Sequence, residues 1–236
     1  MNKIKVSVAM ATYNGSKYLK EQIDSILDQT HQIDELIISD DESNDDTLKI
    51  IKKYESNDKR VHLINGPKKG IKQNFANAIK NTTGDIIFLS DQDDVWMNNK
   101  VEKVLKEFED NDCILVIHNA DIVDENLNAT TNDIFSWRRS GAGIMKNIFK
   151  NTYVGCCIAF KSELKEHILP IPDDIEMHDQ WIGVLGNKYG NNIFLNDKLI
   201  KYRRHTNNSS SLHHHTINLM IRNRINFIKN YFRRTK

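Results

Sequence analysis

The chain has 236 residues, of which 39% are hydrophobic, and a formal net charge of +1. This length suffices for one large domain or two small ones with a buried core, and no stretch approaches the roughly 18 apolar residues that span a bilayer. The first apolar run, residues 6–11, is too short for a secretory signal, so we expect a cytoplasmic protein.

Strand and helix signals alternate through the first half of the chain. Short β-branched runs are typical of strands, and apolar residues three and four positions apart are typical of helices. Strands are predicted at residues 5–10, 35–39, 61–64 and 85–90, and helices at 16–29, 47–54 and 71–79. The short loops between them favour an α/β fold with a mainly parallel sheet covered by helices, in which ligands bind at the carboxyl ends of the strands.

Polar residues follow three of these four strands. The sequences ATYNG, DDESNDD and SDQDD come after the first, second and fourth strands. In the last of them, LSDQDDVW at residues 89–96, three carboxylates crowd into four positions. They could form a solvated turn that caps the next helix, or a divalent cation and a phosphorylated ligand could neutralise them. A second acidic cluster on the same edge of the sheet favours the ligand site.

The second half has a less regular pattern. A helix is predicted at residues 100–108, strands at 113–117, 153–160 and 198–202, a short helix between Ser162 and Pro170, and another from the EMHDQW segment to Leu185. The loops around residues 118–155 should shape the ligand pocket, but their sequence does not indicate how. Three cysteines, two of them adjacent, match no disulfide framework or CxxC metal site and are expected in the core.

We expect one domain at residues 1–212, followed by a helical tail at 213–236. Within the domain, residues 1–95 would form a nucleotide-binding half and residues 96–212 an acceptor half. Four segments, VSVAMATYNG, LIISDDESNDDT, FLSDQDD and HDQW, resemble in this order the family 2 glycosyltransferases with the GT-A fold. The segments SDQDDVW, HDQW and YRRHTNN look most like bacterial polysaccharide enzymes of the rhamnosyltransferase type. The resemblance implies a Rossmann-like sheet flanked by helices and the transfer of a sugar from a nucleoside diphosphate to a hydroxyl with inversion.

The resemblance also implies roles for residues around the nucleotide. Ala11 would contact the base through its backbone, Tyr13 would pack on the ring, and Asp41 would accept the imide N–H of uracil or thymine. Asn74 matches an Asn near the nucleotide, and Asp91 would serve the ribose or the metal. Taken singly, Tyr13 is more simply a strand-end aromatic and Asp41 a turn residue, and Asn74 fits a solvent-facing position nearly as well.

The DxD pattern of the family falls on Asp91 and Asp93. Carboxylate oxygens suit Mn²⁺ or Mg²⁺, and the cation would stabilise the leaving diphosphate. Asp93 would be the direct ligand, and His205 in YRRHTNN would complete the metal site, although a lone His is more often a packing residue. Asp94 is expected to point elsewhere, as a helix cap or a sheet-edge residue.

Asp179 in HDQW matches the catalytic aspartate of the family, the base that takes the proton of the acceptor hydroxyl. His178 stands where many members have Glu, which bears on the subfamily rather than on the chemistry. His178 and Trp181 are assigned to the acceptor, because an aromatic face packs well against a pyranose. The alternative for Trp181 is a core anchor for the following helix.

The tail is basic and amphipathic. All 32 Asp and Glu lie at or before Asp197, whereas ten of the 33 Lys and Arg lie after it, so the two parts carry 23 − 32 = −9 and +10. An apolar stripe predicts a helix within residues 217–236 and is formed by Ile217, Ile221, Ile225, Ile228 and Phe232. This stripe could dock on the body as a core helix or lie on an anionic membrane, which would suit a lipid-linked acceptor.

The leading prediction is an inverting, metal-dependent glycosyltransferase that extends a bacterial surface polysaccharide from a nucleotide-sugar donor. A sugar-phosphate nucleotidyltransferase has a similar sheet, but ATYNGSKYL replaces the Gly-rich, basic loop that this class carries after the first strand. A non-catalytic nucleotide- or glycan-binding subunit is the other alternative. Nucleic-acid binding is not expected, because the tail lacks the interleaved aromatics of a base-stacking surface.

Overall fold

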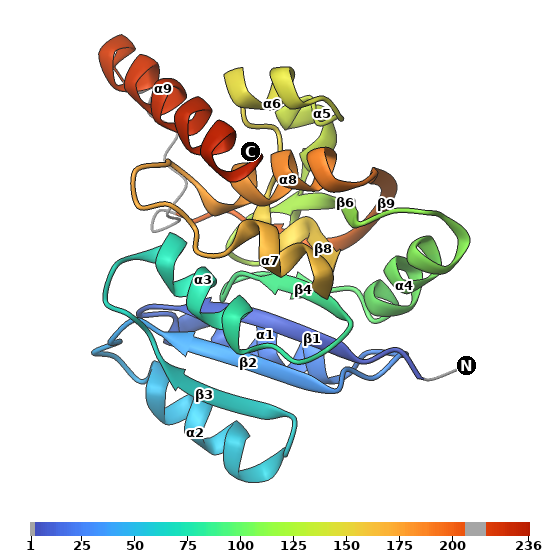
Figure 1. Cartoon of the computed structure of the whole chain (residues 1–236). Coiled ribbons are helices and arrows are strands. Elements are labelled where there is room, and N and C mark those ends of the chain that lie inside the picture. Colours follow the sequence, from blue (N-terminus) through green and yellow to red (C-terminus); the bar gives the residue numbers. More distant parts are fainter. Residues whose placement is uncertain (1–2, 206–215) are drawn as a thin grey trace.

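The computed structural model describes residues 3–205 and 216–236. Within these residues, nine strands form one sheet in the order β3-β2-β1-β4-β8-β6-β9-β5, with β7 paired to β6 outside this path (Figure 1). The first half of the chain contributes β1 (Val6–Thr12), α1 (Ser16–Leu27), β2 (Glu35–Asp40), α2 (Thr47–Asn57), β3 (Val61–Asn65), α3 (Ile71–Asn81) and β4 (Ile86–Ser90). Strands and helices alternate here as predicted.

The first four strands form the parallel part of the sheet. β1 lies between β2 and β4, and β2 pairs with β3, all in parallel register. The chain moves outward from β1 to β3 and then returns across β1 to β4, so right-handed crossovers place α3 on the face opposite α1 and α2 (Figure 1). All residues of β1 and β4 are buried, as expected for strands whose two faces are both covered.

The second half of the sheet is mixed rather than parallel. β8 runs antiparallel between β4 and β6, β9 runs parallel to β6, and β5 runs antiparallel to β9. The elements are β5 (Val95–Trp96), α4 (Lys100–Asp110), β6 (Leu115–Val123), β7 (Ala129–Asp133), α5 (Ile134–Arg138), α6 (Ile144–Phe149), η1 (Gly155–Cys157), β8 (Ile158–Lys161), η2 (Ser162–Leu164), α7 (Lys165–Ile168), α8 (His178–Tyr189), β9 (Asn192–Arg203) and α9 (Ile217–Arg234).

The predicted strand at residues 153–160 is wrong in its first part. The chain turns through η1, where Cys157 N donates to Val154 O at 3.0 Å, and only then enters β8. The turn is set by a close approach to α8, because a Cβ on Gly155 would lie 2.9 Å from Nε2 of His178. The late strand predicted at 198–202 is the end of the longer β9, whose half-exposed first residues carry no strand pattern.

The tail helix α9 docks on the body, although Ile228 is the one described member of the predicted stripe that packs against the core. Phe227 is 2% exposed and meets the ring of Trp181 edge-on with centroids 5.7 Å apart, and Asn230 Nδ2 donates to Asp174 Oδ1 at 2.7 Å. Four members of the stripe are exposed instead: Ile217, Ile221, Ile225 and Phe232. The boundary predicted between residues 212 and 213 lies outside the described residues. Among the described helices, none has both the length and the apolar character needed to cross a membrane.

Candidate functional site

The carboxyl ends of β1 and β4 meet where the strand order reverses. Loops that leave neighbouring strands in opposite directions create a crevice at such a point. A cavity of about 1300 Å³ lies here and extends to α8 and α9. Nine of the ten residues assigned from the sequence line it: Ala11, Tyr13, Asp41, Asn74, Asp91, Asp93, His178, Asp179 and His205.

Asn74 ties together the ends of β1 and β2. Its Nδ2 donates to Thr12 O at 3.1 Å and to Ser39 O at 2.8 Å, and only 2% of the residue is exposed, which rules out the solvent-facing alternative. Among the described residues, its Oδ1 has no hydrogen-bond partner. A buried acceptor without a partner is costly, so a ligand that brought an N–H or O–H to this atom would gain affinity.

Asp41 and Tyr13 stand at the same end of the cavity. Asp41 accepts hydrogen bonds from the amides of Lys68 at 2.5 Å and Gly70 at 2.8 Å and so fixes the loop after β3, where Gly70 has a φ of +80°. Tyr13 is 56% exposed, so its ring is open to a ligand. Gln92, which the sequence analysis did not assign, brackets the Tyr13 backbone by accepting from its amide at 2.9 Å and donating to its carbonyl at 3.1 Å.

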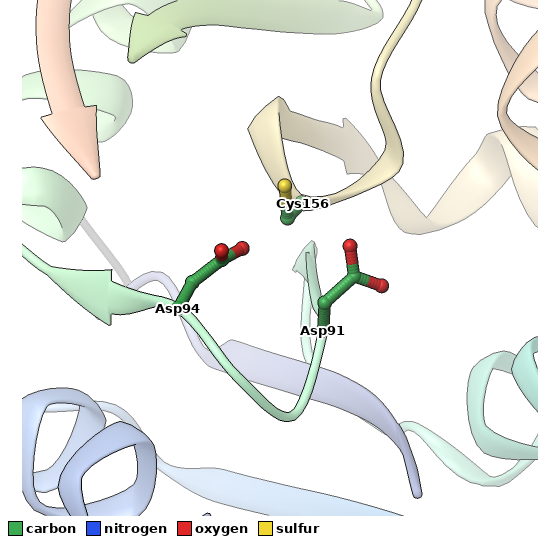
Figure 2. Close-up of side chains that lie close together, drawn as sticks. All are labelled: Asp91, Asp94 and Cys156. Carbon is green, nitrogen blue, oxygen red and sulfur yellow. The ribbon is translucent and has the colours of Figure 1, made fainter. Parts of the chain in front are cut away.

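Asp94 does not line the cavity, but its carboxylate lies close to that of Asp91. Figure 2 shows the carboxylates of Asp91 and Asp94 directed toward the sulfur of Cys156, and one ligand atom of each residue lies within 4.8 Å of the other two. Asp94 is fully buried; its Oδ1 accepts from the amide of Arg203 at 3.0 Å, whereas its Oδ2 has no partner in the described part of the chain.

Burial dominates the electrostatics of this cluster. It raises the pKa of Asp91 to about 7, with further contributions from the charges of Asp93 and Asp179, and it raises the pKa of Asp94 well above its ordinary value. The fully buried Lys100 compensates part of this charge. Its Nζ donates to Cys156 O at 3.0 Å and lies 3.6 Å from the ring centroid of Trp96, and burial lowers its pKa to about 8.

Asp93 and His205 meet although 112 positions separate them in sequence. Nε2 of His205 lies 2.8 Å from Oδ2 of Asp93, and its ring lies over Tyr18 with centroids 5.0 Å apart. The adjoining Arg203 is 2% exposed and donates to Asp93 O and Glu125 O at 2.8 and 2.7 Å, so it anchors this segment.

The donor set of this acidic cluster is suited to a divalent cation. Asp91, Asp93 and His205 line one cavity, and carboxylate oxygen with imidazole nitrogen is a ligand combination that Mn²⁺ accepts. The unpartnered Oδ2 of Asp94 adds a buried acceptor next to them. A cation would stabilise the charged form of Asp91 and so lower its raised pKa.

Asp179 lies in the first turn of α8, where the helix dipole favours a negative charge. Its Oδ1 accepts from Asn151 Nδ2 at 2.9 Å and from the amide of Gln180 at 2.6 Å. Burial nevertheless raises the pKa of Asp179 to about 6, against the opposing effect of these hydrogen bonds. A carboxylate with a raised pKa is a stronger base than an exposed Asp. Asn151 was not assigned from the sequence, since the loops around it carried no clear pattern.

The two residues assigned to the acceptor have different positions. His178 lines the cavity, stacks on Phe75 with centroids 4.1 Å apart, and has no partner for either ring nitrogen among the described residues. Burial lowers the pKa of His178 to about 3, so the ring is neutral. Trp181 is fully buried, its Nε1 donates to Ile168 O at 2.9 Å, and it does not line the cavity. This placement is that of a core anchor and does not support stacking of Trp181 on a sugar.

Comparisons with known proteins agree with this arrangement. The family model described as "Glycosyl transferase family 2" matches residues 7–169. The dTDP-rhamnosyl transferase RfbG of Shigella flexneri is 29% identical, with 84% of this chain and 72% of RfbG covered. WfgD of Escherichia coli, a UDP-Glc:α-D-GlcNAc-diphosphoundecaprenol β-1,3-glucosyltransferase, is 33% identical over 51% of this chain. The chain spans 47% of the length of WfgD and 38% of another curated glycosyltransferase, from Nostoc.

Solved structures show the same fold at low sequence identity. TarS of Staphylococcus aureus in complex with UDP-GlcNAc superimposes with a TM-score of 0.71 at 18% identity, over 89% of this chain and 62% of that one. The mannosyltransferase PcManGT of Pyrobaculum calidifontis, in complex with GDP-Man and Mn²⁺, gives a TM-score of 0.61 at 21% identity, over 84% and 56% of the chains. With the family model matching more than half of its residues, the chain belongs to glycosyl transferase family 2 and has the GT-A fold.

Proposed function

We propose that the protein is an inverting, metal-dependent glycosyltransferase that moves a sugar from dTDP-rhamnose or a UDP-sugar to a hydroxyl of a growing bacterial surface polysaccharide. The two named donors follow RfbG, a dTDP-rhamnosyl transferase, and TarS, whose structure holds UDP-GlcNAc. Mn²⁺ or Mg²⁺ is the proposed cofactor; Mn²⁺ is the ion in the PcManGT complex.

The observation that carries the proposal is the presence of two acidic centres in one cavity. The loop of Asp91 and Asp93 lies at the end of β4, Asp179 lies at the start of α8, and all three line the same space. The charge of Asp179 contributes, after burial and Asp93, to the raised pKa of Asp91, so the two centres are close enough to interact. A donor diphosphate at the first centre would present its sugar to the second.

The proposed residue roles follow from this placement. Ala11, Tyr13, Asp41 and Asn74 would hold the nucleoside, and Asp91, Asp93 and His205 the cation and diphosphate. When bound, the cation supplies positive charge that stabilises the departing diphosphate. His178 would contact the acceptor.

The proposed transfer is a single displacement. Asp179 takes the proton of the acceptor hydroxyl as that oxygen bonds to the anomeric carbon, and the bond from this carbon to the diphosphate breaks on the opposite face with its electron pair leaving on the diphosphate. The two reacting groups lie on opposite faces of the anomeric carbon, so its configuration inverts. Hydrogen bonds from Asn151 and Gln180 to one oxygen of Asp179 hold its carboxylate in one orientation.

The acceptor is proposed to be lipid-linked, like the GlcNAc-diphosphoundecaprenol acceptor of WfgD. The product would then be a saccharide of an O-antigen or capsule type, assembled at the cytoplasmic face of the membrane. The exposed apolar residues of 217–236 support a peripheral position there. Nothing in the chain favours nucleic acid as a partner over an anionic lipid surface.

A panel of nucleotide sugars tests the proposal. The protein is incubated with dTDP-rhamnose, UDP-glucose, UDP-galactose, UDP-GlcNAc or GDP-mannose, with Mn²⁺ or with EDTA, and released nucleotide and thermal stabilisation are measured. The proposal predicts that one donor class stabilises the protein and is hydrolysed only with Mn²⁺. Stabilisation without any hydrolysis or transfer would favour the non-catalytic subunit, and release of pyrophosphate from a sugar phosphate and a nucleoside triphosphate would favour the nucleotidyltransferase.

A further inference from the structure

Large exposed hydrophobic residues gather on two helices of the protein. In the described residues, eight such side chains are exposed, and six of them lie on α6 and α9: Met145, Phe149, Ile217, Ile221, Ile225 and Phe232. The two helices contact each other and lie at the same end of the molecule, away from β3 and α2 (Figure 1). We call these six residues the α6–α9 face. Large apolar residues that gather on adjoining helices mark an interaction site, whereas such residues scattered singly are ordinary surface.

This face is held rigidly, because the opposite side of α9 is fixed to the body. Phe227 and Asn230 are buried, Asn223 Nδ2 donates to Glu176 Oε2 at 2.9 Å, and Arg234 Nη2 donates to Pro170 O at 2.8 Å. Arg224 joins the two helices by donating from Nε and Nη2 to Phe149 O at 3.1 and 2.8 Å. The exposed isoleucines therefore cannot turn inward without breaking these contacts.

The charge around the face distinguishes between occupants. α9 carries Arg222, Arg224, Lys229, Arg233 and Arg234 and no acidic residue. A second copy of the chain docked face to face would bring two sets of these cations together and would be opposed by their repulsion. An anionic bilayer offers acyl chains to the apolar residues and phosphates to the flanking cations, which is the arrangement of an interfacial helix.

The same two helices also form a wall of the cavity. Met220 and Asn223 of α9 and Ile148 and Phe149 of α6 line it. Phe149 belongs to both surfaces, since it lines the cavity and is 53% exposed. The part of the cavity that Phe149 lines, which is proposed to receive the acceptor, therefore opens at the edge of the α6–α9 face.

We propose that the α6–α9 face lies on an anionic phospholipid bilayer and that the acceptor enters the cavity from the bilayer side, between the edge of α6 and α9. The contact with the bilayer requires only the surface described here. The entry route rests on the proposed function, because it assumes an acceptor that is anchored in the lipid.

Sedimentation with vesicles tests the bilayer contact on the full chain. Wild-type protein is mixed with vesicles of phosphatidylcholine alone or of phosphatidylcholine with phosphatidylglycerol, at low and high salt. The double variant I221S/I225S removes apolar groups that do not line the cavity, and the triple variant R222Q/K229Q/R233Q removes exposed charge. Met97→Ser is the matched control, because Met97 is 39% exposed outside the face. Circular dichroism and thermal melting confirm that each variant is folded.

The proposal predicts binding of wild-type protein and M97S to the anionic vesicles, weakened by salt, and at least about tenfold weaker partitioning of both face variants. It is overturned if the wild type fails to sediment with anionic vesicles, or if I221S/I225S binds as well as M97S. It is also overturned if sedimentation equilibrium shows a wild-type dimer that I221S/I225S converts to monomer, which would make the face an interface between copies.

Donor hydrolysis without vesicles separates this inference from the proposed function. I221S/I225S should hydrolyse the donor at the wild-type rate in solution but transfer sugar to a vesicle-bound acceptor at least about tenfold more slowly. If the wild-type protein does not hydrolyse any donor, the proposed function is contradicted, while the result of the vesicle experiment still stands. Equal transfer to the vesicle-bound acceptor by both proteins would contradict the entry route alone.

Discussion

Asp179 is the residue on which the proposed chemistry depends most. Asn has the same shape and its side-chain oxygen can accept the hydrogen bonds from Asn151 and Gln180 that Oδ1 accepts now. Asp179→Asn should therefore leave the fold and donor binding largely unchanged while transfer falls by about 10² to 10⁴. Asp112→Asn, at an exposed position, is the matched control. Transfer by D179N at a near-normal rate, measured with a quantified acceptor, would show that another group is the base.

The pKa of Asp179 also predicts the pH dependence of transfer. Burial raises this pKa to about 6, so below that pH the carboxyl is protonated and cannot accept the acceptor proton. The value of kcat/KM should therefore fall as pH decreases through about 6. The hydrogen bond from Asn151 opposes this rise in pKa. Asn151→Ala should accordingly move the acidic limb to higher pH. A flat profile between pH 5 and 7, or a limb that N151A shifts to lower pH, would contradict the assignment.

At the scale of elements, α9 carries one buried and one exposed phenylalanine, and the two can be compared directly. Phe227 is 2% exposed against Trp181, whereas Phe232 is 58% exposed on the α6–α9 face. Phe227→Ala should lower the free energy of unfolding by about 3 kcal/mol, because a cavity remains beside the indole. Phe232→Ala should change it by less than about 0.5 kcal/mol. Urea unfolding of both variants measures the difference, and equal effects would show that α9 is not docked as described.

The same helix shows where sequence patterns reach their limit. The period of four and three residues correctly indicated a helix with an apolar stripe, but the docked side combines Phe227, Ile228 and Tyr231 with several Asn and Arg residues. Those polar side chains dock because carbonyl and carboxylate groups of the body meet them, as Asp174 meets Asn230. Such complementarity depends on a partner surface that the local sequence does not contain.

The two halves of the sheet differ in how well the sequence predicts their strands. The parallel strands β1 to β4 were predictable because each is a short run rich in apolar residues, and helices of clear period separate them. The mixed strands were predicted only in part, because β9 is half-exposed at its start and η1 is a turn imposed by contact with His178. Most candidate site residues line the cavity because the motif positions fall at strand ends. Lys100, Gln92 and Asn151 were missed because their roles arise only from tertiary contacts.

At the scale of the whole molecule, charge is separated between the site and the tail. The part up to Asp197 carries −9 and the remainder +10, and the cavity contains the acidic loop after β4. A donor diphosphate is itself an anion, so the acidic loop would repel it without a cation. The basic residues of α9 belong to a helix that forms one wall of the cavity. An anionic lipid on the outer side of this helix would complement their charge. The two charged regions therefore suit two different anions.

Calorimetric titration of UDP and dTDP into the protein tests the central claim, that the loop after β4 holds the donor diphosphate through a divalent cation. The wild type, D179N, D112N and D93N are compared with Mn²⁺ and with EDTA. We predict that the first three bind one of the nucleotides with Mn²⁺ and lose it with EDTA, and that D93N binds at least about tenfold more weakly. Equally tight binding with EDTA, or by D93N, would contradict the claim.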